Sequence, residues 1–411
     1  MLACGTTSLP RRMRIRLLIA NAHVAGGTSR TVSSTATALA ARGHDVEIVS
    51  VLRRRRRPAF PPGRSVAVRD LVDEYAARRA PAPVTPAERA AALARRVASV
   101  APSVAGHPFD PRTREWSVRT DIELVRWLRS VPDGVVVGTR PALNLALARF
   151  AQRGVVRIAQ DHMNLDSYRG PLRRSIRRAY PRLDAVVCLT ERDAAEYGAL
   201  LGEGARVLAI PNGIPDLSHL RADPEAKTVL AAGRLSRRKG FDRLLSAWAR
   251  VAPGHPGWRL EIYGAGEEEA SLHAQIARLG LAGSAQLMGF SRQMHARMAG
   301  ASLYAMTSRR EGLPMVLLEA MAIGLPAVAY DCPTGPRDVI ADGVDGYVVR
   351  DGDEEALAGR LAMLMDDPEA RRRMGEAARA KAAAYDVARL AERWEALFAD
   401  LAAAKRRRGG D

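Results

Sequence analysis

The chain has 411 residues, too many for one ordinary hydrophobic core, so its length predicts two domains of roughly 150–220 residues each. Hydrophobic residues make up 47% and charged residues 26%, a balance typical of soluble globular proteins and not of disordered or membrane proteins. The net charge of +18 indicates an anionic partner, but only 5% of residues are aromatic, which argues against a nucleic-acid-binding surface. A polyanionic substrate or an acidic membrane surface fits this charge better.

Almost all of the basic residues are arginines. Only Lys227, Lys239, Lys381 and Lys405 are lysines. Together with the abundance of alanine, this skew indicates codon bias in a GC-rich genome rather than selection for phosphate contacts. An individual lysine in this chain is therefore more informative than an individual arginine.

The three cysteines, Cys4, Cys188 and Cys332, are far apart, and none lies in a CxxC or other metal-ligand spacing. This spacing predicts neither a disulfide framework nor a zinc site, and it indicates a reducing cytosol. The first residues, MLACG, resemble a lipoprotein cleavage box but lack the charged and apolar segments that export requires. Residues 1–12 are therefore predicted to be a disordered leader, and Met13 to begin the folded chain.

The most apolar stretch, residues 312–330, carries Glu319 near its centre and contains several glycines and prolines. It is interpreted as a buried helix followed by a strand rather than as a membrane span. The sequence therefore predicts a cytoplasmic protein, and a peripheral contact at the inner face of the membrane is left open.

The first predicted elements form a βαβ unit. A strand at 14–20 is followed by a glycine-containing turn, a helix over roughly 28–42 and a strand at 45–51. Such a unit requires a parallel sheet. Further strands of this sheet are predicted at 134–138, 155–160, 183–190 and 206–211.

Two less regular regions lie between these strands. Residues 53–63 are a basic, proline-broken loop, interpreted either as solvated or as a contact for an anionic substrate or lipid headgroup. Residues from about 73 to 115 contain an alanine- and arginine-rich helix bounded by prolines. A further helix is predicted at 121–129, with a shared face made by Ile122, Val125 and Leu128.

A Pro-Asn-Gly turn within 210–217 interrupts the pattern, and a new set of strands begins at 227–235. The predicted architecture is α/β, with two doubly wound, Rossmann-like domains that face an interdomain cleft. The predicted parts are the first domain at 13–215, the second domain at 216–385 and a last segment at 386–411 that packs back on the first domain. The second domain's later strands are predicted at 259–264, 284–290, 301–307, 325–330 and 346–349.

The strongest motif for chemistry is EGLPMVLLEA at 311–320. Gly312 and Pro314 suit a loop that enters a helix, and the start of a helix offers backbone amides to a diphosphate. Glu311 and Glu319 stand on either side of that start. Two carboxylates so placed can accept hydrogen bonds from a sugar and from a ribose.

A second motif, AAGRLSRRKGFDRLL at 231–245, places Arg234 after a strand and Lys239 before a helix. Cations at these two positions can bind a diphosphate and stabilise charge on a leaving group. Ordinary surface charge is the alternative for Arg234, whereas Lys239 is one of only four lysines.

In these motifs the sequence resembles the GT-B-fold retaining glycosyltransferases of family four, the glycosyl transferases group 1. This family includes mannosyl-, glucosyl- and N-acetylglucosaminyltransferases. In the first domain the resemblance rests on the Gly-Gly turn after the first strand and on a histidine after a later strand. In the second domain it covers nearly the whole length, through the segments at 233–241, 263–268, 311–319, 332–340 and 342–349.

The resemblance implies a role for each matching residue. Glu319 would bind the ribose of the donor, Glu311 the transferred sugar, and Arg234 and Lys239 the diphosphate. His162 would lie beside the sugar as the family's active-site histidine. The remaining binding positions implied are Gly26 and Gly27, which would let the backbone approach donor phosphate and acceptor, and Gly312 and Leu313 at the helix start.

The implied reaction is hexosyl transfer from a nucleotide-sugar with retention of the anomeric configuration, in which the acceptor attacks from the face that the diphosphate leaves. No metal or other cofactor is expected, because Arg234, Lys239 and the helix start supply positive charge. The pair Asp351 and Asp353 could suggest a metal site, but it precedes a helix and is interpreted as a helix cap.

Three other functions were weighed against the transferase. A dinucleotide-dependent oxidoreductase needs G-x-G-x-x-G, and residues 264–269 read GAGEEE instead. A sugar-nucleotide epimerase on the same fold and a non-catalytic sugar or nucleic-acid binding protein stay as alternatives. The donor nucleotide, the sugar and the acceptor stay open: a glycan, a lipid-linked glycan, a polymer or a small molecule, with a slight preference for an anionic or membrane-bound acceptor.

Overall fold

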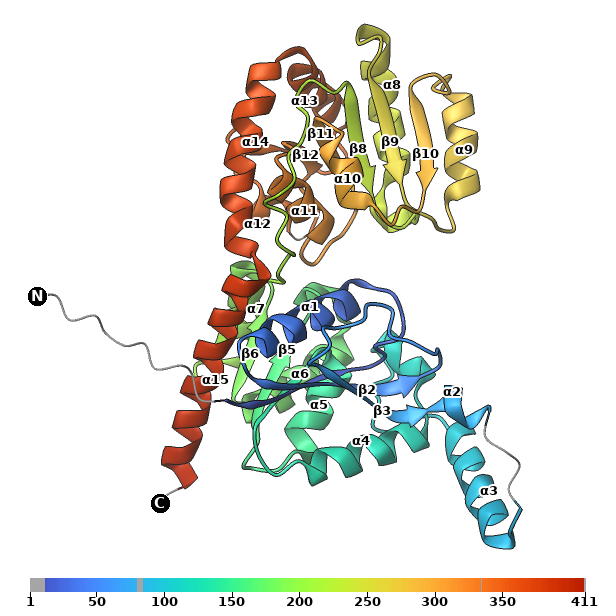
Figure 1. Cartoon of the computed structure of the whole chain (residues 1–411), viewed down its shortest axis with the longest axis vertical. Helices are drawn as coiled ribbons and strands as arrows, with labels where there is room; N and C mark the ends of the chain where they lie inside the picture. The colour runs from blue at the N-terminus through green and yellow to red at the C-terminus, as the bar shows by residue number, and fades with distance from the viewer. Residues whose placement is uncertain (1–11, 80–83, 334, 410–411) are drawn as a thin grey trace, which may run out of the picture. The chain divides into compact units, whose positions relative to one another are not determined.

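The computed structural model describes residues 12–79, 84–333 and 335–409 of the chain (Figure 1). The chain forms two compact units, one made by residues up to Gly213 together with those from Val387, and the other by Ile214–Asp386. The sequence had placed the boundaries beside these positions, near residues 215 and 385. The predicted leader at 1–12 lies outside the described residues, except for Arg12.

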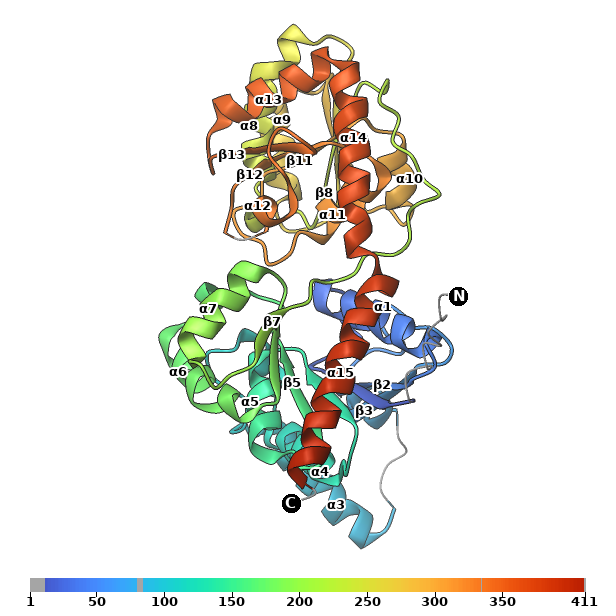
Figure 2. The same cartoon turned by 90° about the vertical axis from the view of Figure 1, so that its left-hand side faces the viewer.

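The first unit is built on a parallel sheet of seven strands in the order β3-β2-β1-β4-β5-β6-β7 (Figure 2). Its register pairs Ile15 of β1 with Val46 of β2 on one side and with Val135 of β4 on the other. The strands are β1 (Arg14–Ile19), β2 (Asp45–Arg53), β3 (Ala67–Asp73), β4 (Val135–Gly138), β5 (Val156–Gln160), β6 (Ala185–Cys188) and β7 (Val207–Ala209).

Helices cover both faces of this sheet because alternate residues of each strand point to opposite faces. On one face Leu17 packs with α1 and α15, and on the other Leu18 packs with α4 and α5. The last helix, α15, contributes Trp394 and Phe398 to the first of these cores. The helices are α1 (Gly27–Ala41), α2 (Glu74–Ala77), α3 (Pro86–Val100), α4 (Val118–Ser130), α5 (Pro141–Phe150), α6 (Gly170–Ala179), α7 (Glu191–Leu201) and α15 (Val387–Gly409).

The second unit has a parallel sheet of six strands in the order β10-β9-β8-β11-β12-β13. They are β8 (Thr228–Ala232), β9 (Arg259–Tyr263), β10 (Ala285–Gly289), β11 (Leu303–Met306), β12 (Ala327–Tyr330) and β13 (Gly346–Val349). The helices of this unit are α8 (Phe241–Val251), α9 (Glu269–Arg278), α10 (Met294–Ala299), α11 (Met315–Ile323), α12 (Pro336–Val339), α13 (Glu354–Asp366) and α14 (Pro368–Ala382).

Each sheet has a point where the strand order reverses, and ligands of open α/β sheets bind outside the carboxyl ends of the strands at such a point. In the first unit this point lies between β1 and β4, and in the second unit between β8 and β11. The fold is therefore the predicted one, with two doubly wound units, and its topology indicates one candidate binding place in each.

The predicted face of α4 is correct at Leu128 but wrong at Ile122. Ile122 is 46% exposed, whereas Leu124, Trp127 and Leu128 are buried. The physical reason is Asp121, whose buried carboxylate accepts hydrogen bonds from Ser103 Oγ and from the backbone N–H groups of Val104 and Ala105. These bonds turn the Asp121 side of α4 inward, and the apolar residues three, six and seven positions later follow it.

Candidate active site

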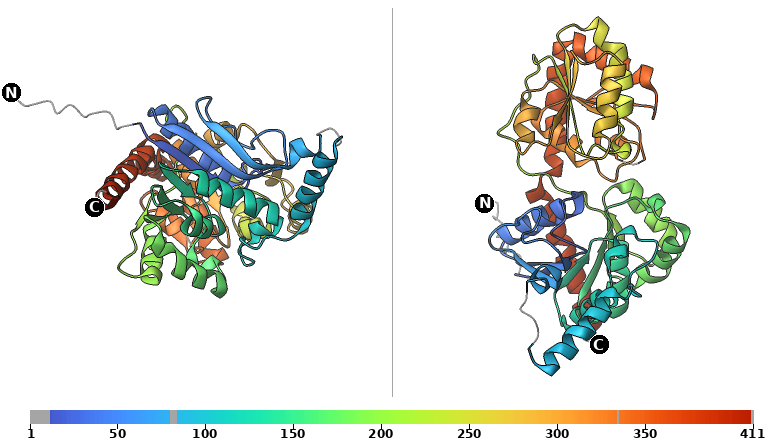
Figure 3. Two further views of the ribbon diagram at one scale, coloured as in Figure 1. Left: turned by 90° about the horizontal axis from the view of Figure 1, so that it is seen from below. Right: turned by 90° about the vertical axis from the view of Figure 1, so that its right-hand side faces the viewer.

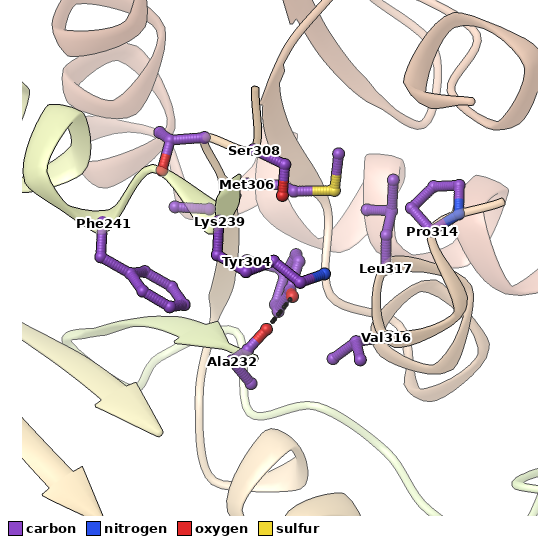
Figure 4. A pocket seen from close by; sticks show the side chains of 11 residues that line it. Ala232, Lys239, Phe241, Tyr304, Met306, Ser308, Pro314, Val316 and Leu317 are labelled. Atoms are coloured by element: carbon purple, nitrogen blue, oxygen red, sulfur yellow. Dashed lines mark hydrogen bonds between the residues drawn. The ribbon is translucent and has the colours of Figure 1, made fainter. Parts of the chain in front are cut away.

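A small, open hollow lies at the switch point of the second sheet (Figure 4). It lies beside the ends of β8 and β11 and the start of α11, which are the elements that the topology indicates. Tyr304 of β11 donates a hydrogen bond across it to the backbone oxygen of Ala232 at 3.3 Å. Its walls are made by Ala232, Lys239, Phe241, Tyr304, Ala305, Met306, Thr307, Ser308, Pro314, Val316 and Leu317.

Lys239 and Glu311 meet beside this hollow. Lys239 Nζ lies 2.6 Å from Glu311 Oε1, and Ser308 Oγ donates to the same oxygen at 2.6 Å. The side chain of Glu311 is only 7% exposed and that of Lys239 19%. Two motifs separated by about seventy residues thus form one charged cluster, in which positive charge is held where solvent screens it little.

A glycine holds Lys239 in this place. Gly240, the next residue, has φ 67°, and a Cβ there would come within 2.0 Å of the backbone oxygen of Thr307. The turn that ends in Lys239 can therefore lie against the end of β11 only if this residue has no side chain. The Lys239 stem lies over Gly233, where a Cβ would come within 3.2 Å of its Cε.

Glu319 lies in α11 and is buried, with 2% exposure. His295 of α10 holds it through a contact of 3.0 Å between Nε2 and Oε2. The sequence does not indicate a role for His295, because 24 residues separate it from Glu319 and no local pattern joins them.

The start of α11 has no side-chain cap and no acidic residue in its first turn. Gly312 and the buried Leu313 lead into it, and Pro314 is its N-cap. An uncapped helix start carries partial positive charge from its backbone amides. The Lys239 ammonium and this helix start therefore both favour a negatively charged group in the same hollow.

Arg234 does not join this cluster. Its side chain is 74% exposed, and it pairs with Glu267 at 3.1 Å. Glu267 belongs to the GAGEE turn that follows β9. The structure thus brings Lys239 and Glu311 together and holds Arg234 on the surface of the same unit.

A second, larger open hollow lies at the switch point of the first sheet. Gly26 and Gly27 both line it at the start of α1, which again has no side-chain cap and no acidic residue in its first turn. A Cβ on Gly27 would meet nothing within 4 Å, so packing does not require glycine there. A ligand that binds close to the backbone would require glycine at such a position, because a side chain would be in its way.

Arg140, which was not among the residues predicted for the site, also lines this second hollow. Its guanidinium forms a bidentate pair with the fully buried Asp110. A signal in the sequence could have indicated it, because Arg140 lies two residues after a predicted strand, but its partner Asp110 lies 30 residues earlier in an irregular region. The pair holds a cation at the carboxyl end of β4.

His162 follows β5. Both of its ring nitrogens are buried, and neither has a hydrogen-bond partner among the described residues. Burial, together with the positive charge of Arg140, lowers the pKa of His162 to about 4, so the imidazole is neutral at physiological pH. Buried nitrogens without partners are costly, and a ligand hydroxyl would satisfy them.

The neighbour of His162 is anchored firmly. Asp161 is buried and accepts hydrogen bonds from Asn144, Tyr180 and Tyr197. Burial raises the pKa of its carboxyl to about 6, although the tyrosine hydrogen bonds oppose this. This network fixes the carboxyl end of β5, from which His162 extends.

Asp353 caps α13 by accepting a hydrogen bond from the backbone N–H of Ala356, as predicted, and Asp351 pairs with Arg243 at 2.7 Å. Within the part of the chain that the structure describes, no group of three or more His, Cys, Asp or Glu side chains is arranged to hold a metal ion. In the same residues, no helix has the length and apolarity needed to span a bilayer.

Two family models match the chain, Glycosyltransferase Family 4 over residues 25–216 and Glycosyl transferases group 1 over residues 217–381. The amylovoran biosynthesis glycosyltransferase AmsD of Erwinia amylovora is 32% identical over 309 residues, which are 70% of this chain and 87% of that protein. The exopolysaccharide phosphotransferase SCO2592 of Streptomyces coelicolor is 37% identical over 395 residues, which are 95% of this chain. The chain spans only 41% of the length of that relative.

The fold is also found in solved structures. Staphylococcus aureus TarM, in complex with fondaparinux, alpha-GlcNAc-glycerol and UDP, superposes with a TM-score of 0.74 at 14% identity, covering 94% of this chain and 99% of TarM. The lipopolysaccharide outer core galactosyltransferase WaaB gives a TM-score of 0.67 at 16% identity, covering 94% of this chain and 99% of WaaB. The chain therefore belongs to the glycosyl transferases group 1 and is a glycosyltransferase with the GT-B fold.

Proposed function

We propose that this enzyme transfers a hexosyl group from a nucleoside-diphosphate-sugar to a hydroxyl of an acceptor in polysaccharide biosynthesis, with retention and without a metal ion. The observation that carries the proposal is the cluster of Lys239, Glu311 and Ser308 beside the uncapped start of α11. The negative charge of a diphosphate suits this place. The TarM structure, which contains UDP, supports testing uridine nucleotides first.

In the proposed reaction the bond between the anomeric carbon and the diphosphate oxygen breaks, and a bond from that carbon to the acceptor oxygen forms on the same face. The acceptor hydroxyl gives its proton to the departing diphosphate. Lys239, Arg234 and the start of α11, with Gly312 and Leu313, stabilise the charge that develops there. Glu311 accepts hydrogen bonds from the transferred sugar.

The other assignments follow from the same proposal. Glu319, oriented by His295, accepts hydrogen bonds from the ribose of the donor. Neutral His162 makes a hydrogen bond with a sugar hydroxyl. The hollow lined by Gly26, Gly27 and Arg140 binds an acceptor, and an anionic or lipid-linked one suits the guanidinium.

The first test is a thermal-shift and donor-hydrolysis screen of UDP-, GDP- and ADP-sugars in the presence of EDTA, with Glu319→Ala beside the wild type. We expect one nucleotide class to stabilise the wild type and to be hydrolysed slowly, and the variant to lose both effects. A response that requires a divalent metal would contradict the metal-independent part of the proposal. Conversion of the donor into an isomeric sugar nucleotide, without acceptor, would identify an epimerase instead.

Retention is tested separately once an acceptor is found. The configuration of the new glycosidic bond, read by NMR from its anomeric coupling constant, is expected to match that of the donor. The opposite configuration would overturn the proposed mechanism and leave the family assignment unaffected.

A further inference from the structure

The helix α3 of the first unit exposes its larger apolar side chains to solvent, which is unusual for a helix that packs only on its own protein. Not one of its fifteen residues is buried, and only the small Ala92 and Ala98 are half-buried. Its larger apolar side chains point into solvent: Leu93 is 63% exposed, Val97 61% and Val100 80%. Figures 1 and 3 show α3 extending away from the sheet of the first unit.

These side chains form one face. Leu93, Val97 and Val100 are spaced by four and three residues, so they line up on one side of the helix, away from the half-buried alanines. Val84 before the helix and Val104 after it are also exposed, at 77% and 84%. A contiguous apolar face of this kind on a folded protein indicates an interaction site.

The charges around the face are almost entirely positive. Arg89 and Arg96, seven residues apart, follow one edge of the apolar face, and Arg95 lies on the opposite side. The only acid of the helix is Glu88, whose carboxylate is already occupied by the backbone N–H groups of Val84 and Thr85. These hydrogen bonds lower the pKa of Glu88 and keep its charge within the helix cap.

Further basic residues lie beside α2, the helix that precedes α3 in the chain. Arg54, in the arginine run, pairs with Glu74 of α2, so that run lies beside α2. The next three residues of the run, Arg55, Arg56 and Arg57, are exposed. An apolar face flanked by basic residues is typical of a helix that lies in the interface of a membrane.

We propose that α3 docks on an anionic lipid bilayer, with Leu93, Val97 and Val100 entering the boundary between headgroups and acyl chains. Arg89 and Arg96 then lie at the level of the lipid phosphates. A soluble polyanion would satisfy the arginines but leave the apolar face in water. A second copy of the chain would cover the apolar face but bring arginines of equal charge together.

The test is co-sedimentation of the full chain with vesicles of phosphatidylcholine alone or with about a third phosphatidylglycerol. We expect the wild type to bind the anionic vesicles about tenfold more strongly than the neutral ones, and to lose most of this preference when salt is raised to about 0.5 M. Val97→Asp is expected to weaken binding to the anionic vesicles by about tenfold. Its control is Val344→Asp, which changes a valine of similar exposure, 58%, in the second unit and should bind like the wild type.

Charge is tested by the double change Arg89→Gln with Arg96→Gln, against the exposed pair Arg250→Gln with Arg278→Gln. The first pair should reduce binding to anionic vesicles several-fold, and the second should not. Absence of vesicle binding by the wild type, or equal binding by Val97→Asp, would overturn the proposal. A dimer of the wild type that Val97→Asp converts to a monomer, without vesicle binding, would assign the face to a second copy.

The inference does not rest on the proposed chemistry. Val97→Asp should keep the thermal shift produced by the donor nucleotide, because α3 lies outside both hollows. Loss of vesicle binding with a normal donor response therefore supports the membrane site, and an absent donor response in all variants would affect only the proposed function.

Discussion

Lys239 forms an ion pair with Glu311 and, in our proposal, also binds the donor diphosphate. Lys239→Ala should therefore lower kcat/KM by about 10²–10³-fold, because it removes a preorganised cation and leaves the Glu311 carboxylate beside Ser308 without its counter-charge. Steady-state kinetics with the identified donor checks this. Lys227→Ala, at an exposed position of the same unit, is the control and should be normal.

Arg234 makes a contrasting prediction, because its side chain is mostly in solvent. Its pair with Glu267 is a surface ion pair, which contributes about 0–1 kcal/mol to stability. Arg234→Ala should therefore leave the melting temperature nearly unchanged while lowering kcat/KM by about tenfold or more, if the guanidinium binds diphosphate. A variant with normal kinetics would show that Arg234 is only a surface charge.

His162 predicts an unusual pH dependence. Its pKa in the folded protein is about 4, below the ordinary value of 6.5, so the unfolded chain binds the proton first as pH falls. This histidine therefore makes the fold less stable as pH falls through 6.5 toward 4, and it stays neutral over that range. An NMR titration of His162 should show no change between pH 8 and about 5, and a midpoint near 6.5 would contradict the burial argument.

At the scale of elements, the turn before α8 depends on one glycine. Gly240→Ala should cost about 3 kcal/mol or more, because it combines a positive φ with a Cβ 2.0 Å from the Thr307 oxygen, and it should abolish the donor thermal shift by moving Lys239. Gly280→Ala is a matched control. Gly280 has nearly the same φ, 69°, with nothing within 4 Å of a Cβ, so its cost should be about 1 kcal/mol by chemical denaturation.

The helix α15 is tied to the first unit by charge as well as by packing. His44 and Arg42 bind the two carboxylate oxygens of Glu395. Burial raises the pKa of Glu395, but these hydrogen bonds outweigh it and lower the pKa below its ordinary value of 4.5. The pair therefore contributes stability above pH 4.5 that is lost as pH falls further.

Glu395→Gln should destabilise the protein by about 1–3 kcal/mol at pH 7, measured by denaturant unfolding. The difference between variant and wild type should shrink as pH falls below 4.5, because the wild-type carboxylate then becomes protonated. A difference independent of pH would mean that the Glu395 side chain acts through its shape alone. Glu392→Gln, half of a more exposed pair with Arg42, should have little effect.

At the scale of the whole molecule, the sequence predicted two doubly wound units with parallel sheets. These features are encoded locally, in the spacing of apolar residues and in the glycine-rich turns that follow strands. The strand β3 was missed because its sequence, AVRDLVD, carries charged residues at an edge of the sheet. The prediction that Ile122 of α4 faces inward was wrong, because Asp121 is buried by hydrogen-bond partners outside the helix.

The side chains that sequence reasoning missed share one property: their partners lie far away along the chain. His295 and Glu319 are 24 residues apart, and Arg140 and Asp110 are 30 apart. No periodicity connects such pairs, because only the tertiary fold brings them together. The arginine run is a further example, because its sequence does not show which arginines have acidic partners. Arg53 and Arg54 pair with acids, whereas Arg55, Arg56 and Arg57 are exposed.

The return of α15 to the first unit has a consequence for biosynthesis. The residues that complete the core of the first sheet, Leu390, Trp394 and Phe398 among them, are translated after the whole of the second unit. On the ribosome, Ile214–Asp386 can fold as a continuous segment, while one face of the first sheet is covered by α1 but still lacks α15, so part of it stays open. We expect the nascent first unit to be the part that needs chaperones, and a chain stalled before residue 387 to aggregate through that open face.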